Sequence, residues 1–165
     1  MLFEMEIDAD AIHIRSARPE EADALTQIAL AAKRHWGYSE ELLTLWKPSL
    51  TITSEFVQLG HTFVAVSAHE LAGFIGCEPT PPTVVEIVHL WVLPQFMHKG
   101  IGRQLWNRAV TLCESHSCSA VELDSDPFAR AFYERLGAHH IANTPSIPEG
   151  RQLPRLRFEV PVNCG

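Results

Sequence analysis

The sequence lacks several features that would place it in a specialised class. Its four cysteines form no C-x-x-C pair. No apolar run approaches the roughly 20 residues that cross a bilayer. Lys and Arg number 13 against 20 Asp and Glu, a net charge of −7, so the basic face of a nucleic-acid-binding protein is not expected. The remaining composition, 46% apolar and 20% charged, is that of an ordinary globular domain.

Motifs for metal binding and for serine hydrolysis are also missing. Nine histidines are present, but none belongs to an H-E-x-x-H or comparable ligand spacing, and we expect no metal site. There is no G-x-S-x-G elbow for a serine nucleophile. Residues 1–3 are followed at once by the acidic Glu4 and Glu6, which is unlike a signal peptide. We therefore expect a cytoplasmic protein with free thiols that binds neither membranes nor nucleic acid.

Hydrophobic periodicity divides the chain into alternating strands and helices. At 165 residues it fits a single domain over 1–165. This order indicates an α/β or α+β fold with helices packed on one sheet, and the apolar segment 83–93 is expected at its centre. We expect strands at 12–15, 62–67, 71–76, 83–93, 120–123, 139–142 and 156–160, and helices at 19–34, 40–46, 100–115 and 127–136.

The most informative segment is the turn over residues 92–102, where the central strand leads into a helix. The helix begins on Gly100 and Gly102, which carry no Cβ to keep a ligand from the backbone. Free N–H groups and the helix dipole favour phosphate at such a start, although a plain turn that uses glycine is the alternative. A P-loop is excluded because Lys99 precedes the glycine, and a dinucleotide fingerprint is excluded because Leu105 occupies its third small position.

This turn resembles motif A of the GNAT superfamily of acyl-CoA-dependent N-acetyltransferases. Met97 stands where that family usually has Gln or Arg. A second segment, DPFARAFYERLGA at 126–138, is similar to the GNAT pattern N-x-x-A-x-x-F-Y-E-x-x-G-F, with Asp126 for Asn and Ala138 for Phe. The chain is identified as a member of this superfamily over about residues 12–142. It also resembles an uncharacterised bacterial subgroup, through the strings Trp36-Gly37-Tyr38 and Ile147-Pro148 together with Arg151 and Leu153-Pro154.

The resemblance implies a fold and a co-substrate. The fold is GNAT-like, a central, mostly antiparallel mixed sheet of about six or seven strands flanked by about four helices. The co-substrate is acetyl-CoA, with its pyrophosphate on the loop amides and its pantetheine arm along the strand. For Lys99, a solvated charge is the alternative. The implied cofactor-binding residues are Leu90, Trp91, Val92, Met97, His98, Lys99, Gly100, Ile101, Gly102, Arg103, Asp126 and Arg130.

Acetylation of an amine requires a base, because a free primary ammonium has a pKa of ~10. Glu86 is the candidate base. Strand alternation places it on one face with Leu90 and Val92, where apolar neighbours should raise the pKa of its carboxyl. A solvated residue at the start of the strand is the alternative. His89 is a second candidate base, expected on the opposite face, where a packed histidine is the alternative. By resemblance, Tyr133 would be the acid that protonates the leaving thiolate.

The resemblance also implies that the first two helices contribute to the wall of the acceptor site. Trp36 and Tyr38 would be its substrate-binding residues, since aromatic rings can enclose a cation, although Trp36 is equally a candidate for the core. The predicted reaction is direct transfer of the acetyl group to the primary amine of a small molecule. A protein N-terminus or lysine as acceptor, or a non-catalytic acyl-CoA sensor, remains an alternative. Relatives are often dimers, so a homodimer is allowed.

Overall fold

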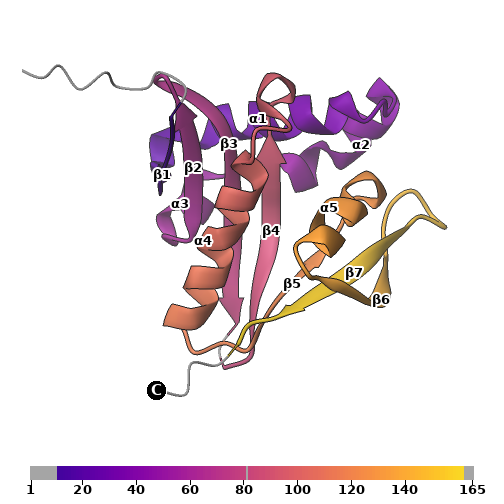
Figure 1. The fold of residues 1–165 in the computed structure, drawn as a ribbon. Coiled ribbons are helices and arrows are strands. Elements are labelled where there is room, and N and C mark those ends of the chain that lie inside the picture. Colours follow the sequence, from indigo (N-terminus) through magenta and orange to yellow (C-terminus); the bar gives the residue numbers. More distant parts are fainter. Residues whose placement is uncertain (1–10, 81, 162–165) are drawn as a thin grey trace, which may run out of the picture.

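One seven-stranded sheet with helices on both faces forms the body of the protein (Figure 1). The computed structural model describes residues 11–80 and 82–161. The strands follow the order β1-β2-β3-β4-β5-β7-β6, and every neighbouring pair is antiparallel except β4 and β5. Their bounds are β1 Ile12–Ser16, β2 Thr62–Ser67, β3 Glu70–Thr80, β4 Val84–Val92, β5 Ala120–Asp124, β6 His139–Pro145 and β7 Gln152–Glu159. The predicted mixed, mostly antiparallel sheet is confirmed.

The helices bury their apolar stripes on the two faces of this sheet. On one face Leu105 of α4 belongs to the same buried cluster as Ile75 of β3, and on the other Leu25 of α1 belongs to the same buried cluster as Phe74. Their bounds are α1 Ala22–His35, α2 Glu40–Leu50, α3 Ser54–Gln58, α4 Ile101–Ser115 and α5 Arg130–Arg135, with short 3-10 turns at Pro19–Glu21, Pro94–Phe96 and Pro127–Ala129. Among the described residues, none of these helices has the length and apolar character needed to cross a membrane.

Several elements extend past their predicted ends. Helix α2 continues through Pro48 to Leu50, because Leu50 is buried and its packing outweighs the backbone hydrogen bond that a proline removes. Helix α3 was not predicted. Its five residues are too few to display a period, although Thr53 caps it by accepting a hydrogen bond from the Phe56 amide. Strands β3, β6 and β7 are also longer than their sequence patterns indicated.

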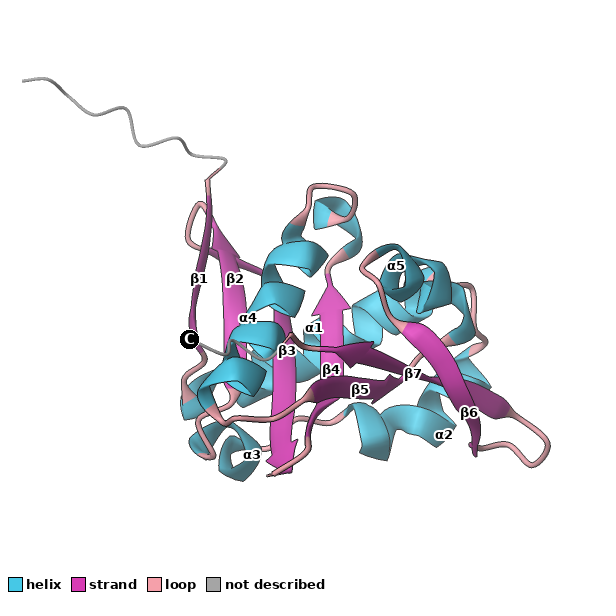
Figure 2. Cartoon of the chain, turned by 60° about the horizontal axis from the view of Figure 1, so that its bottom comes forward, coloured by secondary structure: helices cyan, strands magenta, loops and turns pink. Residues whose placement is uncertain are grey.

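The sheet opens where its two parallel strands meet. β4 and β5 pair only between Val84–Glu86 and Ala120–Glu122. Beyond these residues they diverge, as Figure 2 shows. Among the strands that the structure describes, none therefore pairs with the β5-facing edge of β4 from Ile87 to Val92. Backbone N–H and C=O groups along that edge are available to a bound molecule.

β4 also contains a bulge. In its pairing with β3, Gly76 lies opposite His89 while Cys77 lies opposite Ile87. Val88 is therefore an extra residue on β4. A bulge of this kind interrupts the alternation of side chains along a strand, so residues before and after it exchange faces.

This bulge overturns the predicted position of Glu86. The register places the Glu86 side chain on the face shared by His89, opposite the face of Leu90 and Val92. The prediction assumed unbroken alternation along the strand, and it was therefore wrong for Glu86, whereas His89 does lie on the face opposite Leu90 and Val92 as expected. The sequence signal was weak, because β-branched and large apolar residues occupy both faces of this strand.

Candidate active site

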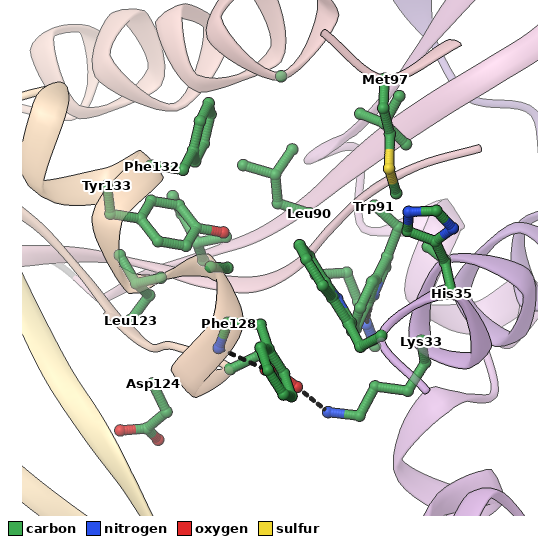
Figure 3. A pocket seen from close by; sticks show the side chains of 18 of the residues that line it. Lys33, His35, Leu90, Trp91, Met97, Leu123, Asp124, Phe128, Phe132 and Tyr133 are labelled. Carbon is green, nitrogen blue, oxygen red and sulfur yellow. Dashed lines mark hydrogen bonds and ion pairs between the residues drawn. The ribbon is translucent and has the colours of Figure 1, made fainter. Parts of the chain in front are cut away.

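A cavity of about 750 Å³ occupies the opening between β4 and β5 (Figure 3). Its walls come from β4, the turn before α4, the start of α4, helix α5, and the α1–α2 side of the sheet. Four of the predicted site residues, Glu86, Tyr38, Lys99 and Arg130, are not part of its lining. The predicted residues that do line it are Trp36, Leu90, Trp91, Val92, Met97, His98, Gly100, Ile101, Gly102, Arg103, Asp126 and Tyr133.

The glycine turn, most of which lines this cavity, contains a run of backbone amides that are free to bind a ligand. His98 and Gly100 both have positive φ, at 63° and 80°, and Gly100 is the N-cap of α4. The first amide of α4 to reach a backbone carbonyl is that of Gln104, which donates to Gly100 at 3.2 Å. Among the described residues, the amides of 98–103 find no acceptor. Consecutive free amides at a helix start form a site suited to phosphate.

Gly102 was predicted to let a ligand approach the backbone, but the space beside it is occupied by a side chain of α5. A Cβ at this position would lie 3.0 Å from the ring of Phe132 on α5. The absence of a side chain therefore lets α5 approach the first turn of α4. Gly100, by contrast, has open space around it, and its positive φ is the reason for glycine there.

Two of the basic residues predicted to bind the cofactor are engaged elsewhere. Arg130 forms an ion pair with Glu134, one turn along α5, at 2.8 Å. The Lys99 ammonium lies 5.6 Å from the centre of the Phe96 ring. Within the lining of the cavity, the side chains at the turn that can carry a positive charge are thus those of Arg103 and His98.

Tyr133 brings a hydroxyl group to the cavity from α5. Figure 3 shows its ring beside Phe132 with the hydroxyl pointing into the pocket. The side chain is buried, and its hydroxyl makes no hydrogen bond with the described residues. Burial, with a smaller contribution from the charge of Asp126, raises the pKa of Tyr133. The phenol is therefore protonated at neutral pH and can donate a hydrogen bond.

Glu86 is held by an arginine rather than by apolar neighbours. Both of its carboxylate oxygens accept hydrogen bonds from Arg155 on β7, at 2.9 and 2.6 Å. Arg155 also contacts Glu122 at 3.5 Å and Asp124 at 3.3 Å. The apolar surroundings predicted for Glu86 are therefore absent, because its face of the sheet carries a network of charged residues.

His89 is a packed strand histidine that also lines the cavity. Its ring lies against Phe56 and Phe74, and Trp91 Nε1 donates to its Nδ1 at 3.4 Å. Burial lowers the pKa of His89 to about 4. The imidazole is thus neutral at physiological pH, and it gains no proton until the solution is strongly acidic.

A buried polar cluster closes the α1–α2 side of the cavity. The Asp126 carboxylate accepts from Lys33 Nζ at 2.5 Å, from the Tyr38 hydroxyl at 3.1 and 3.2 Å, and from the Phe128 amide at 2.9 Å. Arg151 donates to the Tyr38 hydroxyl at 3.2 Å. Asp126 was predicted to contact the cofactor and Tyr38 the substrate. Both instead make their hydrogen bonds within this cluster.

Aromatic rings surround the cluster. Lys33 Nζ lies 4.6 Å from the ring centre of Trp46, and the Arg151 guanidinium lies 4.4 Å from the same ring. Trp46 Nε1 donates to the carbonyl of Ile147 at 2.7 Å, which joins α2 to the loop between β6 and β7. Trp36 lines the cavity and stacks on Phe128 at 5.5 Å. The predicted aromatic wall is thus present, but it already encloses two cations of the protein.

Sequence reasoning missed Lys33 as a site residue. A signal existed, because Lys33 follows Thr26 by seven and Ala29 by four residues and so falls on the buried stripe of its helix. A lysine in such a stripe requires a partner of opposite charge. That partner, Asp126, lies far along the chain, so its identity could not be read from local spacing.

The comparisons with known proteins agree with this geometry. A family model described as "Acetyltransferase (GNAT) family" matches residues 22–138. The chain belongs to this family. It is 30% identical over 100 residues to the "Uncharacterized N-acetyltransferase YvbK" of Bacillus subtilis (strain 168), a match that covers 59% of this chain and 64% of that relative. The matched segment thus spans under two thirds of the relative's length.

Solved structures share the fold at low sequence identity. One is the PaiA N-acetyltransferase of Thermoplasma acidophilum in complex with coenzyme A, with a TM-score of 0.71, 19% identity, and coverage of 90% of this chain and 99% of that one. Another is the ribosomal-protein-S18-alanine N-acetyltransferase of Escherichia coli, with a TM-score of 0.67, 17% identity, and coverage of 94% and 97%. These likenesses show a common architecture.

The buried His89 predicts a specific pH dependence of stability. Its pKa is lowered from 6.5 to about 4, so the unfolded chain binds a proton that the folded chain rejects. This contribution to stability is complete above pH 6.5 and is lost as the pH falls toward 4, by up to about 3 kcal/mol. We expect the free energy of unfolding of His89→Gln to fall less steeply over this interval than that of the unmodified protein. Urea titrations at several pH values measure both slopes, and parallel slopes would contradict the prediction.

Proposed function

We propose that the protein is a single-domain N-acetyltransferase that transfers the acetyl group of acetyl-CoA directly to the primary amine of a small molecule. One observation carries the proposal. The free amides of 98–103, the unpaired edge of β4 and the Tyr133 hydroxyl all meet one cavity. These are the three groups needed to bind a pyrophosphate, to align an amide-bearing arm, and to protonate a leaving thiolate.

The residues of the turn and of β4 fit this co-substrate. The amides of 98–103 would donate to the pyrophosphate, with Arg103 beside them. The backbone of Leu90 to Val92 would extend the sheet onto the pantetheine arm, which carries amide groups of its own. A β4 amide in the same unpaired edge would donate to the developing oxyanion. Bound acetyl-CoA supplies a thioester carbonyl for attack by the amine.

The proposed transfer is a single displacement with two proton movements. The neutral amine nitrogen forms a bond to the acetyl carbon while the carbon–sulfur bond breaks. The thiolate takes a proton from Tyr133, and the amine proton passes to a base. Glu86 stays our candidate for that base. Because it is held by Arg155 and is not part of the cavity lining, its proton transfer would pass through water.

A small acceptor is favoured over a polypeptide by the acceptor side of the cavity. There Trp46 on α2 is tied to Ile147 of the β6–β7 loop by a 2.7 Å hydrogen bond. This hydrogen bond holds α2 and the β6–β7 loop together, which leaves less room between them for a polypeptide than for a small amine. Comparison of a panel of small amines with N-terminal and lysine peptides, measured as release of free CoA thiol, tests the preference. A protein that binds acetyl-CoA but releases no thiol with any amine would be a sensor.

Gly102→Asp should abolish CoA binding. The change adds a negative charge where an anion would bind, and its Cβ would lie 3.0 Å from the Phe132 ring. An acidic residue in the first turn of a helix favours the helix itself, so α4 should still form. Gly102→Ala is the matched control, since it adds the Cβ without the charge. Titration calorimetry on folded variants measures affinity, and an unchanged value for Gly102→Asp would refute the phosphate site.

Glu86→Gln should lower turnover by about 10²-fold if Glu86 is the base. The affinity for CoA should stay nearly constant, because Glu86 lies outside the turn. Raising the pH should partly restore the rate, since more of the amine is then neutral without help. A rate that falls without recovery at high pH would identify Glu86 as a partner that merely holds Arg155. The reference variant is Glu159→Gln, which removes an exposed carboxylate from the neighbouring Arg157.

Tyr133→Phe should lose turnover at the low end of the ~10²–10⁴-fold expected for a general acid. The ring contacts with Trp106 and Phe132 are kept, and the lost hydroxyl has no hydrogen bond among the described residues, so CoA binding and stability should change little. An acyl donor with a more acidic thiol should reduce the deficit, because its thiolate leaves without a proton. An equal deficit with both donors would make Tyr133 a packing residue.

A further inference from the structure

We propose that Lys33 and Arg151 form a subsite for a carboxylate group of the acceptor, so that the acceptor is an amino acid or another small amine that carries a carboxylate. The inference deepens the proposed function and rests on it. Both side chains line the cavity, from α1 and from the loop that precedes β7. Figure 3 shows Lys33 pointing into the pocket from α1 while the Tyr133 hydroxyl points into it from α5.

The charges of the buried cluster do not balance. Lys33 and Arg151 are two cations whose side chains are 9% and 16% exposed, and Asp126, 6% exposed, is the carboxylate between them. Burial lowers the pKa of Lys33, the negative charge of Asp126 opposes that shift, and the positive charge of Arg151 adds to it. The three charges are therefore close enough to act on one another. A largely buried excess of one positive charge is costly unless an anion compensates it. The rings of Tyr38 and Trp46 supply only part of that compensation.

Hydrogen-bond donors also remain in this cluster. Arg151 has five N–H groups, and among the described residues one reaches Ser146 Oγ and one reaches the Tyr38 hydroxyl, each at 3.2 Å. Its distance to Asp126 is 3.8 Å, which is an ion pair but not a hydrogen bond. Three donors of a cavity-lining arginine are therefore left for a ligand. A carboxylate can accept two of them at once.

Another part of the cavity lining carries the complementary charge. Arg155 and Arg157 are shared by four carboxylates, those of Glu86, Glu122, Asp124 and Glu159, which leaves an excess of negative charge. Asp124, which also accepts from Thr144 Oγ1 at 2.6 Å, lines the cavity. Figure 3 shows Asp124 and Lys33 on either side of Phe128. A molecule with an ammonium group at one end and a carboxylate at the other matches this polarity. A carboxylate also fits better than a phosphate ester, because the excess on the α1 side is a single positive charge.

The decisive experiment compares amino acids with their own carboxamides as acceptors. Each pair shares the amine and the side chain, and only the charge at the carboxyl end differs. We expect kcat/KM, corrected for the fraction of neutral amine, to be about 10- to 100-fold higher for the acids. Arg151→Gln should reduce this preference to within about 2-fold. CoA affinity should not change. The matched control is Arg34→Gln, which removes an exposed cation beside Lys33.

The possible failures are distinguishable. Equal rates for acids and amides in the unmodified protein, or an equal loss of both in Arg151→Gln, would overturn the carboxylate subsite while leaving the acetyltransferase intact. If no amine releases thiol, the proposed function fails instead. Calorimetric titration of amino acids into the CoA-bound protein then tests the carboxylate subsite independently of catalysis. Binding that Arg151→Gln abolishes would support it, and no binding would refute it. Should Arg151→Gln not fold, the comparison of acids with amides in the unmodified protein decides between these outcomes.

Discussion

The end of strand pairing between β4 and β5 is the constraint on which the rest of the molecule depends. The two strands pair over three residues each and then separate. The gap exposes the backbone edge of a strand that would otherwise be at the centre of the sheet. α4 begins at one end of this gap with its amides free, and α5 brings Tyr133 to its side. A fully paired sheet with the same side chains would have no cavity between these strands.

The buried ion pair between Lys33 and Asp126 connects the two sides of that gap. Lys33 belongs to α1, and Asp126 caps the 3-10 turn that leads into α5. Removal of one partner of such a pair typically costs about 3–5 kcal/mol, because the other charge stays buried. The pair therefore couples the position of α5, and with it Tyr133, to the acceptor wall. Lys33 and Arg151 both pack on the ring of Trp46, and Trp46 donates a hydrogen bond to Ile147. These contacts extend the link to the β6–β7 loop.

Much of the fold could be predicted because its signals are local. Glycine at 100 and proline at 94 and 127 mark the starts of helical turns, and the apolar stripe of α4 has a clear period. Tyr133, which the second motif singled out, lies on the cavity wall. The errors about Glu86 have a different cause. The bulge at Val88 and the ion pair of Glu86 with Arg155 depend on partner strands that are distant in sequence.

By itself, the sequence determined the strand and helix order, the turn with free amides, and membership of an acetyltransferase family. These follow from residue type and short spacing, which decide backbone conformation within a few residues. Tertiary structure alone decided which face Glu86 occupies and what charge surrounds it. It also decided that Lys33, Asp126 and Arg151 share one buried cluster. The physical reason is that burial and charge pairing join α1, the start of α5 and the loop before β7, and no local pattern records such contacts.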